Sequence, residues 1–144
     1  MLAANISAAD FISQYAKEGV YRIHEHPESL KIQRLSQVLK NRGINWNGSI
    51  EDIENISEFI LKLNKRDDAP ILNMLILQSM QRAEYSTINK GHFGLKCEPY
   101  THFTSPGRRY PDLLVHRIII SILNSEEFNY EGLQLTLEDC SEKE

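Results

Sequence analysis

Cysteine is scarce in this chain, and long apolar runs are absent. The 144 residues include two cysteines, Cys97 and Cys140, which stand far apart and outside any Cys-x-x-Cys spacing. We therefore expect neither a zinc site nor a disulfide framework, and this usage is typical of a reducing cytoplasm. No window approaches the roughly 18 consecutive apolar residues of a membrane span, and the first residues lack the pattern of a signal peptide. The predicted location is cytoplasmic, with no membrane partner.

The chain also lacks an excess of positive charge. Its formal net charge is −4 and its isoelectric point is near 5.7. This balance argues against a protein that coats nucleic acid through its overall charge, but it is compatible with a local basic patch. Ordinary proportions of apolar residues (41%) and charged residues (25%) indicate a folded chain rather than a disordered one. A chain of this length fits a single domain.

Two helices are predicted in the first third of the chain. Apolar residues recur at helical spacing over residues 1–16, and Gly19 ends this helix. Pro27 suits the first position of a second helix, which stops at Gly43. The first helix has no cap before it, and the last residues up to Glu144 are still polar and charged. Both ends of the sequence therefore suggest a piece of a longer chain.

Two more helices are predicted in the middle of the chain. Ser49 and Asp52 approximate a capping box ahead of an amphipathic helix over 50–63. The next helix begins before Pro70, and residues 71–80 are apolar on nearly all sides. A helix that is apolar all round is expected to be buried, so this one is predicted to be the most buried of all.

The last third mixes strands and helices. Two short strands are predicted near 92–96 and 100–104, joined by a turn at Glu98-Pro99. A long helix is predicted from Pro111 to about residue 123, followed by a loop and a last helix from Leu133. The predicted fold is α+β and mostly helical, with a small antiparallel β pair packed among about five to six helices.

Basic and aromatic side chains alternate in residues 82–117. Arg108 and Arg109 precede the predicted helix start, and Arg117 lies two turns further along. Guanidinium groups and a helix N-terminus both suit phosphate oxygens. Aromatic residues that can stack unpaired bases are interleaved with these cations. These aromatics are Tyr85, Phe93, Tyr100, Phe103 and Tyr110. The pattern is compatible with a platform for single-stranded RNA.

A structural interpretation of the same residues stays open beside this one. Aromatic residues on short strands are more often part of a core, and an arginine near a helix start often pairs with a carboxylate such as Asp112. The spacings of His92, His102 and His116 match no common metal motif, so these histidines are expected to be structural.

The same segment resembles the signature of the RNB catalytic domain of the ribonuclease R and ribonuclease II family. The similarity lies in AEYS at 83–86, GHFGL at 91–95 and the run YTHFTSPGRRYPDL at 100–113 with His116 and Arg117 behind it. MLAAN at 1–5 and YRIHEHP at 21–27 are similar to further family segments. The resemblance covers about residues 1–123, is strongest over 82–117, and is closer to ribonuclease R than to ribonuclease II. It implies that residues 1–144 are the C-terminal part of this catalytic domain.

The resemblance implies a processive, hydrolytic 3′→5′ exoribonuclease that releases nucleoside 5′-monophosphates. In the family two Mg²⁺ ions are held by closely spaced aspartates, which lie upstream of the matched region. Asp67 and Asp68 sit in a helix-capping context and are not expected to hold metal. No metal is therefore expected on this chain, and the isolated fragment is predicted to be inactive.

The resemblance also implies roles for single residues. Arg108 matches the family arginine that contacts the scissile phosphate, and Arg109 is the next candidate, for phosphate contact or for holding the loop. Ser105 and Thr104 shape the turn and could donate hydrogen bonds to the RNA backbone. The remaining candidates are Tyr85 and Tyr100 for lining the RNA channel or packing, and Arg117 and His116 for tying the long helix to its neighbours, with Arg117 also a candidate backbone contact.

One position departs from the family pattern. Gly107 stands where the family usually has an apolar branched residue. Glycine loosens a turn at a cost of about 1 kcal/mol in local order. We therefore expect Gly107→Ile to stabilise the fold.

Two other functions remain open. One is a truncated, non-catalytic protein that binds RNA or regulates through the same arginines, and the other is a purely structural helical domain whose motif is a relic of gene decay. The expected partners are single-stranded RNA and the N-terminal half of the catalytic domain. An apolar face that this half would cover is also expected to favour self-association.

Overall fold

A computed structural model describes residues 1–46 and 53–143, and it divides the chain into two compact units. Unit 1 is formed by Met1–Glu25 together with Ala83–Glu144, and unit 2 is formed by His26–Arg82. Unit 1 is therefore assembled from two segments that lie far apart in the sequence, whereas unit 2 is one continuous segment.

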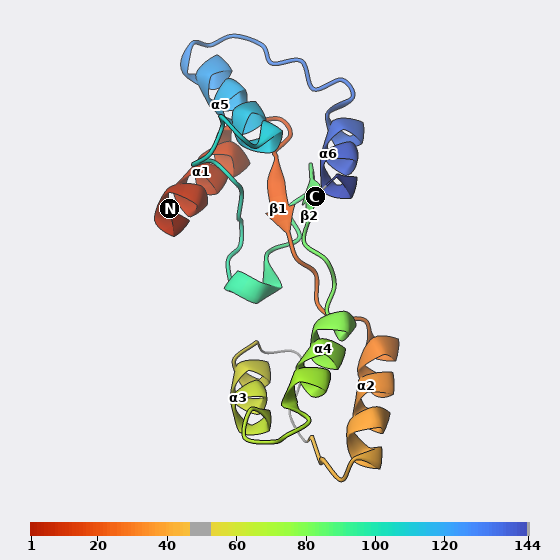
Figure 1. The fold of residues 1–144 in the computed structure, drawn as a ribbon. Coiled ribbons are helices and arrows are strands. Elements are labelled where there is room, and N and C mark those ends of the chain that lie inside the picture. Colours follow the sequence, from red (N-terminus) through yellow and green to blue (C-terminus); the bar gives the residue numbers. More distant parts are fainter. Residues whose placement is uncertain (47–52, 144) are drawn as a thin grey trace. The chain divides into compact units, whose positions relative to one another are not determined.

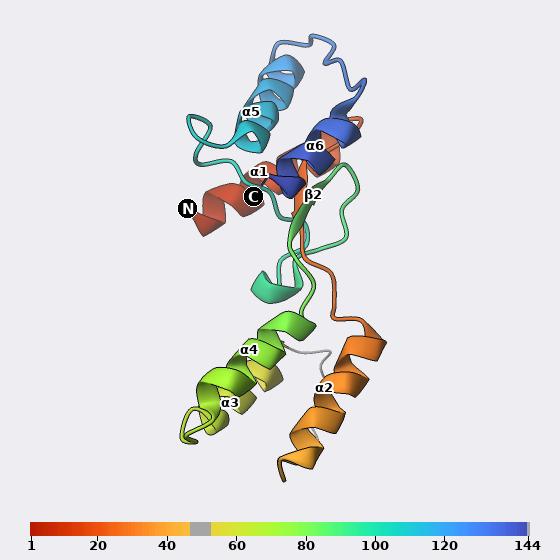
Figure 2. The same ribbon diagram turned by 45° about the vertical axis from the view of Figure 1, so that its right-hand side comes forward.

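Unit 1 is built from helices around a two-stranded sheet. Its elements are α1 (Leu2–Tyr15), β1 (Tyr21–Ile23), β2 (Glu84–Ser86), the short 3-10 helix η1 (Phe93–Leu95), α5 (Tyr110–Leu123) and α6 (Leu133–Glu142). Strands β1 and β2 pair in antiparallel register, with Arg22 opposite Tyr85. Helix α6 packs along β2, and α1 packs against α5 (Figure 1, Figure 2).

The core of unit 1 lies between these helices and the sheet. Ile12 of α1, Val115 and Ile118 of α5 and Leu137 of α6 are completely buried there. The helical spacing predicted these elements well, since the helices expected over 1–16, after Pro111 and from Leu133 are confirmed to within about two residues. The predicted fold class is confirmed as well: the described part of the chain is mostly helical, with six α-helices and one antiparallel strand pair.

The predicted positions of the strands were wrong. Residues 93–95 form η1, and residues 100–104 belong to no strand. The physical reason is a set of long-range partners. The Tyr100 carbonyl accepts the backbone N–H of Arg22 (2.9 Å), and the Thr101 hydroxyl donates to the Val20 carbonyl (2.5 Å). Residues 100–101 therefore bond to the segment around β1 instead of to 92–96.

Unit 2 consists, among its described residues, of three helices. These are α2 (Ser29–Asn41), α3 (Ile53–Leu63) and α4 (Ala69–Ser79), and α2 and α3 each pack against α4. The prediction of helices here is confirmed, but α2 begins two residues after Pro27, with Glu28 at its N-cap position. The predicted capping box of Ser49 and Asp52 lies outside the described residues.

The expectation that the fourth predicted helix is the most buried was wrong. Leu72 and Ile76 of α4 are buried, but Ile71, Met74 and Leu77 on another side of the helix are 50%, 52% and 69% exposed. The sequence is apolar all round, whereas α2 and α3 cover only part of the helix surface. The exposed side chains form an apolar stripe, and self-association through such a surface stays a prediction.

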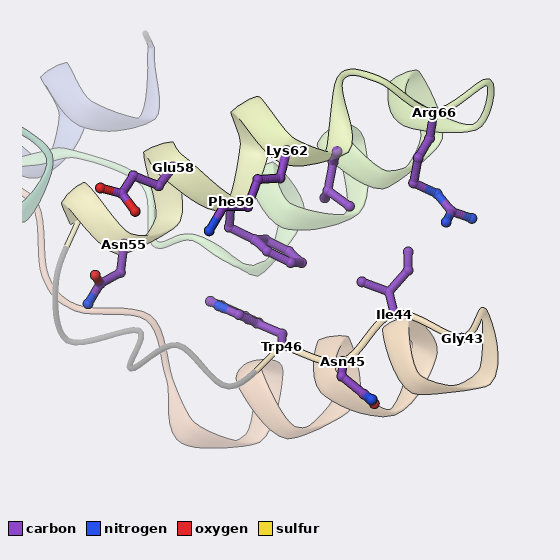
Figure 3. Close-up of a pocket in the computed structure, with 10 residues that line it drawn as sticks. Gly43, Ile44, Asn45, Trp46, Asn55, Glu58, Phe59, Lys62 and Arg66 are labelled. Atoms are coloured by element: carbon purple, nitrogen blue, oxygen red, sulfur yellow. The ribbon is translucent and has the colours of Figure 1, made fainter.

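The single tryptophan belongs to unit 2. The Trp46 and Phe59 rings stack with centroids 5.0 Å apart and an angle of 11° between their planes. A cavity of about 500 Å³ lies beside them, with Lys62 and Arg66 among its lining residues (Figure 3). Arg66 is occupied by Asp68, to whose carboxylate it donates two hydrogen bonds (2.8 and 3.2 Å). Trp46 is thus a packing residue of unit 2 and a natural spectroscopic probe for it.

None of the helices in residues 1–46 and 53–143 has the length and apolar character needed to cross a membrane.

Candidate nucleic-acid interface

The predicted arginine pair lies in the segment that leads into α5, here called the arginine loop (residues 103–109). The Ser105 carbonyl accepts hydrogen bonds from the backbone N–H groups of Arg108 (3.2 Å) and Arg109 (3.1 Å). The chain then enters α5, with Arg109 at the N-cap in an extended conformation and Pro111 in the first turn. Proline suits this place because the first N–H groups of a helix have no intrahelical acceptor. The arginine loop therefore closes as a turn at a helix N-terminus.

A buried carboxylate in the first turn of α5 holds this turn. The side chain of Asp112 is completely buried. Its Oδ1 accepts hydrogen bonds from the Ser105 backbone N–H (2.8 Å) and from Nη2 of Arg109 (2.9 Å). Nε of Arg109 lies 2.9 Å from Oδ2 in an ion-pair contact without hydrogen-bond geometry. Arg109 is thus an internal partner of Asp112, as the structural interpretation of the arginine pair predicted.

An asparagine of α1 fixes the start of the arginine loop. Asn5 is 3% exposed, and both ends of its amide are used. Its Nδ2 donates to the Tyr100 hydroxyl (2.9 Å), and its Oδ1 accepts the backbone N–H of Phe103 (3.1 Å). Because the amide satisfies two groups that are buried or half-buried, it joins residues 100–103 to α1.

His116 of α5 also holds Phe103. The His116 ring stacks on the Phe103 ring, with centroids 4.2 Å apart and 7° between the planes. Nε2 of His116 lies 2.9 Å from the Phe103 carbonyl oxygen, which can only accept, so Nε2 carries a proton and donates. The predicted role of His116 in tying the long helix to its neighbours is confirmed.

Arg108 and Arg117 remain accessible. Both side chains are exposed, and within residues 1–46 and 53–143 neither makes an ion pair or a side-chain hydrogen bond. Tyr110, in the first turn of α5, is 47% exposed. The surface at the start of α5 therefore presents an uncompensated guanidinium group, that of Arg108, and a partly exposed aromatic ring, that of Tyr110.

The two hydroxyl residues of the arginine loop are half-buried. The Ser105 backbone groups shape the turn, as predicted, but its N–H is already donated to Asp112. Oγ1 of Thr104 is buried and has no hydrogen-bond partner in the described part of the chain. The Ser105 N–H and the Thr104 hydroxyl are therefore not open to a ligand in the way that the exposed Arg108 side chain is.

The two predicted channel tyrosines are buried in unit 1. Tyr85 is 3% exposed, its hydroxyl lies 2.8 Å from Nδ1 of His102, and the Arg22 guanidinium lies 4.4 Å from its ring centroid. Tyr100 is 7% exposed and bonded to Asn5. These positions favour the packing role over base stacking, because base stacking needs an open ring face.

Histidine rings contact the buried Tyr100 and one another. The His92 ring lies 5.3 Å from the Tyr100 ring and 5.2 Å from the His24 ring. Burial, the largest cause, and the charge of His24 together lower the pKa of His92 to about 4. His92 is therefore neutral near pH 7 and adds no positive charge for an anionic ligand.

The role of Asn5 was not predicted from the sequence. A signal for it existed, because Asn5 shares the buried face of α1 with Ala8, Ala9 and Ile12. A polar residue on such a face needs partners within the protein. Their identity could not be read from the sequence, since they lie 95 and 98 residues away.

No group of three or more His, Cys, Asp or Glu side chains in residues 1–46 and 53–143 is arranged to hold a metal ion. Asp68, considered from the sequence, instead forms ion pairs with Arg66 (2.8 Å) and Arg42 (3.5 Å). The hydrogen bond from Arg66 is the main reason why the pKa of Asp68 is lowered. The residues in the described part of the chain therefore do not fit a magnesium site.

Residues 1–125 match the RNB domain family. The chain belongs to this family. Over 128 residues it is 41% identical to ribonuclease R of Buchnera aphidicola, an alignment that covers 88% of this chain and 18% of that protein. The RNB signature was therefore identified correctly from the arginine loop and its surroundings.

Solved structures share the RNB fold of this chain. Ribonuclease R of Mycoplasma genitalium in complex with ribose-methylated single-stranded RNA superposes with a TM-score of 0.79 at 26% identity, covering 99% of this chain and 23% of that chain. Yeast Ssd1, described as a pseudonuclease, superposes with a TM-score of 0.77 at 25% identity, covering 96% of this chain and 18% of that chain. The chain thus spans less than a quarter of the length of each of these proteins.

Proposed function

We propose that this chain forms the arginine-bearing part of the catalytic domain of an RNA-degrading exoribonuclease. The reaction is the processive 3′→5′ hydrolysis of RNA to nucleoside 5′-monophosphates. The observation that carries the proposal is the exposed, uncompensated Arg108 on a turn held by buried partners. It is supported by membership of the RNB domain family and by the likeness to a ribonuclease R solved with single-stranded RNA.

Arg108 acts on the scissile phosphate in this proposal. Its planar guanidinium can donate two parallel hydrogen bonds to non-bridging phosphate oxygens. During hydrolysis negative charge develops on these oxygens, and a fixed cation that faces them stabilises the transition state more than the ground state. Arg117, nine residues after Arg108 and exposed on α5, contacts the RNA backbone. Arg109 supports the turn through Asp112.

The metal chemistry of the reaction belongs, in this proposal, to residues outside the matched segment. Mg²⁺ would polarise the phosphate and activate the attacking water in the intact enzyme, and the N-terminal half of the catalytic domain would supply its aspartate ligands. We propose a cytoplasmic location for the intact protein. By itself, the 144-residue chain is proposed to bind RNA weakly and to be inactive.

A second function has a specific observation in its favour. The fold of this chain is similar to that of yeast Ssd1, a pseudonuclease. A member of this fold class can therefore persist without nuclease activity. In the second proposal the protein binds RNA through Arg108 and Arg117 and regulates without cleaving.

RNA binding by the chain itself tests the arginine surface. We would measure the affinity of a labelled 3′-tailed RNA with Mg²⁺ for the unmodified chain, for Arg108→Ala and for Arg34→Ala. Arg34 is an exposed arginine on α2 and controls for the loss of one positive charge. We expect no cleavage by any of them, and weaker binding only for Arg108→Ala. Release of mononucleotides by the unmodified chain would show that its residues assemble a metal site and would contradict the proposed division of the active site.

Activity distinguishes the two proposed functions. Residues 1–125 would replace the matched segment of Escherichia coli ribonuclease R, which is 39% identical to this chain over 128 residues. We expect the chimera to degrade RNA and its Arg108→Ala variant to be slower by about 10²–10³-fold, the usual loss when one transition-state donor is removed. A folded chimera that binds RNA without degrading it would favour the non-catalytic function.

A further inference from the structure

We propose that Asp112 is a positioning residue that fixes the direction in which Arg108 points. This inference rests on the proposed function, because it assumes that Arg108 contacts an RNA phosphate. Asp112 itself is completely buried and touches no ligand. It acts through the two residues that flank the tip of the arginine loop, Ser105 and Arg109.

The carboxylate closes the turn from both of its ends. Oδ1 of Asp112 accepts the Ser105 N–H at 2.8 Å and Nη2 of Arg109 at 2.9 Å. Ser105 comes three residues before Arg108, and Arg109 comes directly after it. With both ends fixed to one buried atom, the backbone at Arg108 has little freedom to rotate.

The glycine at the tip of the turn adds no packing contact. A Cβ atom placed on Gly107 would have nothing within 4 Å, so side-chain packing does not hold this position. The remaining constraints are the backbone hydrogen bonds from Arg108 and Arg109 to the Ser105 carbonyl, at 3.2 and 3.1 Å. The stiffness of the loop therefore depends on the buried carboxylate of Asp112.

The same contact divides the arginine pair into two roles. Arg109 points inward and neutralises the buried charge, as a buried carboxylate requires. Arg108 points outward with its guanidinium free for a ligand. A preoriented guanidinium loses less conformational freedom on binding a phosphate than a freely rotating one.

A double-mutant cycle tests this inference with the 144-residue chain. The affinity for a short single-stranded oligoribonucleotide would be measured for the unmodified chain, Arg108→Ala, Asp112→Asn and the double variant. We expect Arg108→Ala to weaken binding about tenfold and Asp112→Asn about fivefold, with the double variant no weaker than Arg108→Ala alone. A purely structural role for Asp112 would instead make the two losses multiply.

The change in charge caused by Asp112→Asn acts in the direction opposite to the expected loss of affinity, so it cannot produce that loss. Asp112→Asn removes a negative charge, which by itself strengthens binding to RNA. Asp10→Asn, at an exposed position of α1, is the matched control for this effect and is expected to leave binding unchanged or slightly tighter. Weaker binding by Asp112→Asn would then reflect the lost orientation of Arg108.

The failures of the two proposals can be told apart. Unchanged binding by Arg108→Ala overturns the proposed function itself. Weaker binding by Arg108→Ala together with unchanged or tighter binding by a folded Asp112→Asn overturns only the positioning role.

If Asp112→Asn shows no cooperative thermal transition, Arg109→Lys replaces it in the cycle, because lysine keeps the charge but loses the planar guanidinium group. We expect Arg109→Lys to weaken binding about threefold only when Arg108 is present, and an unchanged affinity overturns the inference.

Discussion

The two units of this chain differ in how they use polar side chains. In unit 1 buried polar groups join segments that are distant in sequence, as in the bonds of Asn5 to residues 100 and 103 and of Thr101 to Val20. In unit 2 the side-chain hydrogen bonds are mostly exposed and local, as between Asn73 and Asn64. Unit 1 can therefore hold single side chains in fixed positions, and the candidate site lies there.

The apolar residues do not distinguish the units in this way. Unit 1 buries Val115, Ile118 and Leu137 but exposes Leu123 and Leu135, by 68% and 71%. Unit 2 likewise buries some apolar side chains and exposes others on α4. Exposed apolar side chains are characteristic of surfaces that contact other molecules or other parts of a longer protein only where they form a continuous patch. The difference between the units therefore lies in their polar contacts.

The largest expected effect concerns the buried amide of unit 1. Asn5→Ala leaves the Tyr100 hydroxyl and the Phe103 N–H without their partner, and each such loss costs about 1–3 kcal/mol. We expect the free energy of unfolding to fall by about 3 kcal/mol, measured by circular dichroism in urea. Asn73→Ala in unit 2 is the matched control. It removes an exposed hydrogen bond, from the Asn73 side chain to Asn64, and is expected to cost about 0.5 kcal/mol.

Trp46 allows the unfolding of unit 2 to be followed separately, because it is the single tryptophan and lies in unit 2. Its fluorescence follows unit 2, whereas circular dichroism follows the whole chain. A fluorescence midpoint that moves as far as the dichroism midpoint in Asn5→Ala would show that the two units unfold as one. Equal costs for Asn5→Ala and Asn73→Ala would remove the difference between the units altogether.

Local signals explain which parts of the fold could be predicted from the sequence. The helices of both units follow from apolar periodicity and from Pro111, since these act within a few residues. The true strands could not be found in this way, because β1 and β2 have only three residues each and are paired across some 60 residues of sequence. Strands of three residues are too short to show the alternation of apolar and polar residues by which strands are predicted.

Burial was harder to predict than helix formation. The apolar run of α4 predicted a helix correctly, but its burial depends on how many neighbours cover it, which periodicity does not encode. For the candidate site, the sequence indicated both arginines and named Asp112 as a partner for an arginine. It could not assign Arg109 to the buried carboxylate and Arg108 to the surface, because that choice is made by the geometry of the turn.

A smaller effect is expected from His92, a half-buried histidine of unit 1. The pKa of His92 is about 4 in the folded protein, below the ordinary value of 6.5, chiefly because of burial. Between these pH values the unfolded chain takes up a proton that the folded chain does not. Stability is therefore lost as the pH falls from about 6.5 to about 4. The full shift corresponds to about 3 kcal/mol, and partial solvent exposure reduces the expected loss to about 1–2 kcal/mol.

The measurement is the urea midpoint over this pH range, for the unmodified chain and for His92→Gln. Glutamine does not titrate, so the variant is expected to lose less stability on acidification. The only histidine of unit 2 is His26, so Trp46 fluorescence should change less with pH than circular dichroism does. An identical pH dependence in His92→Gln would show that other groups cause the loss.

The smallest expected effect is a gain, at the tip of the arginine loop. The backbone of Gly107 lies outside the left-handed region, and a Cβ atom there would meet nothing within 4 Å. Gly107→Ile therefore fits without strain but gains no packing contact. It stabilises the protein mainly by restricting the conformations of the unfolded chain, by about 0.5–1 kcal/mol.

Gly43→Ile in unit 2 is the matched control, because Gly43 has equal space but a φ of +71°, so the same substitution is strained. We expect thermal denaturation to show a higher melting temperature for Gly107→Ile and a lower one for Gly43→Ile. A lower melting temperature for Gly107→Ile would mean that the turn needs glycine at this position.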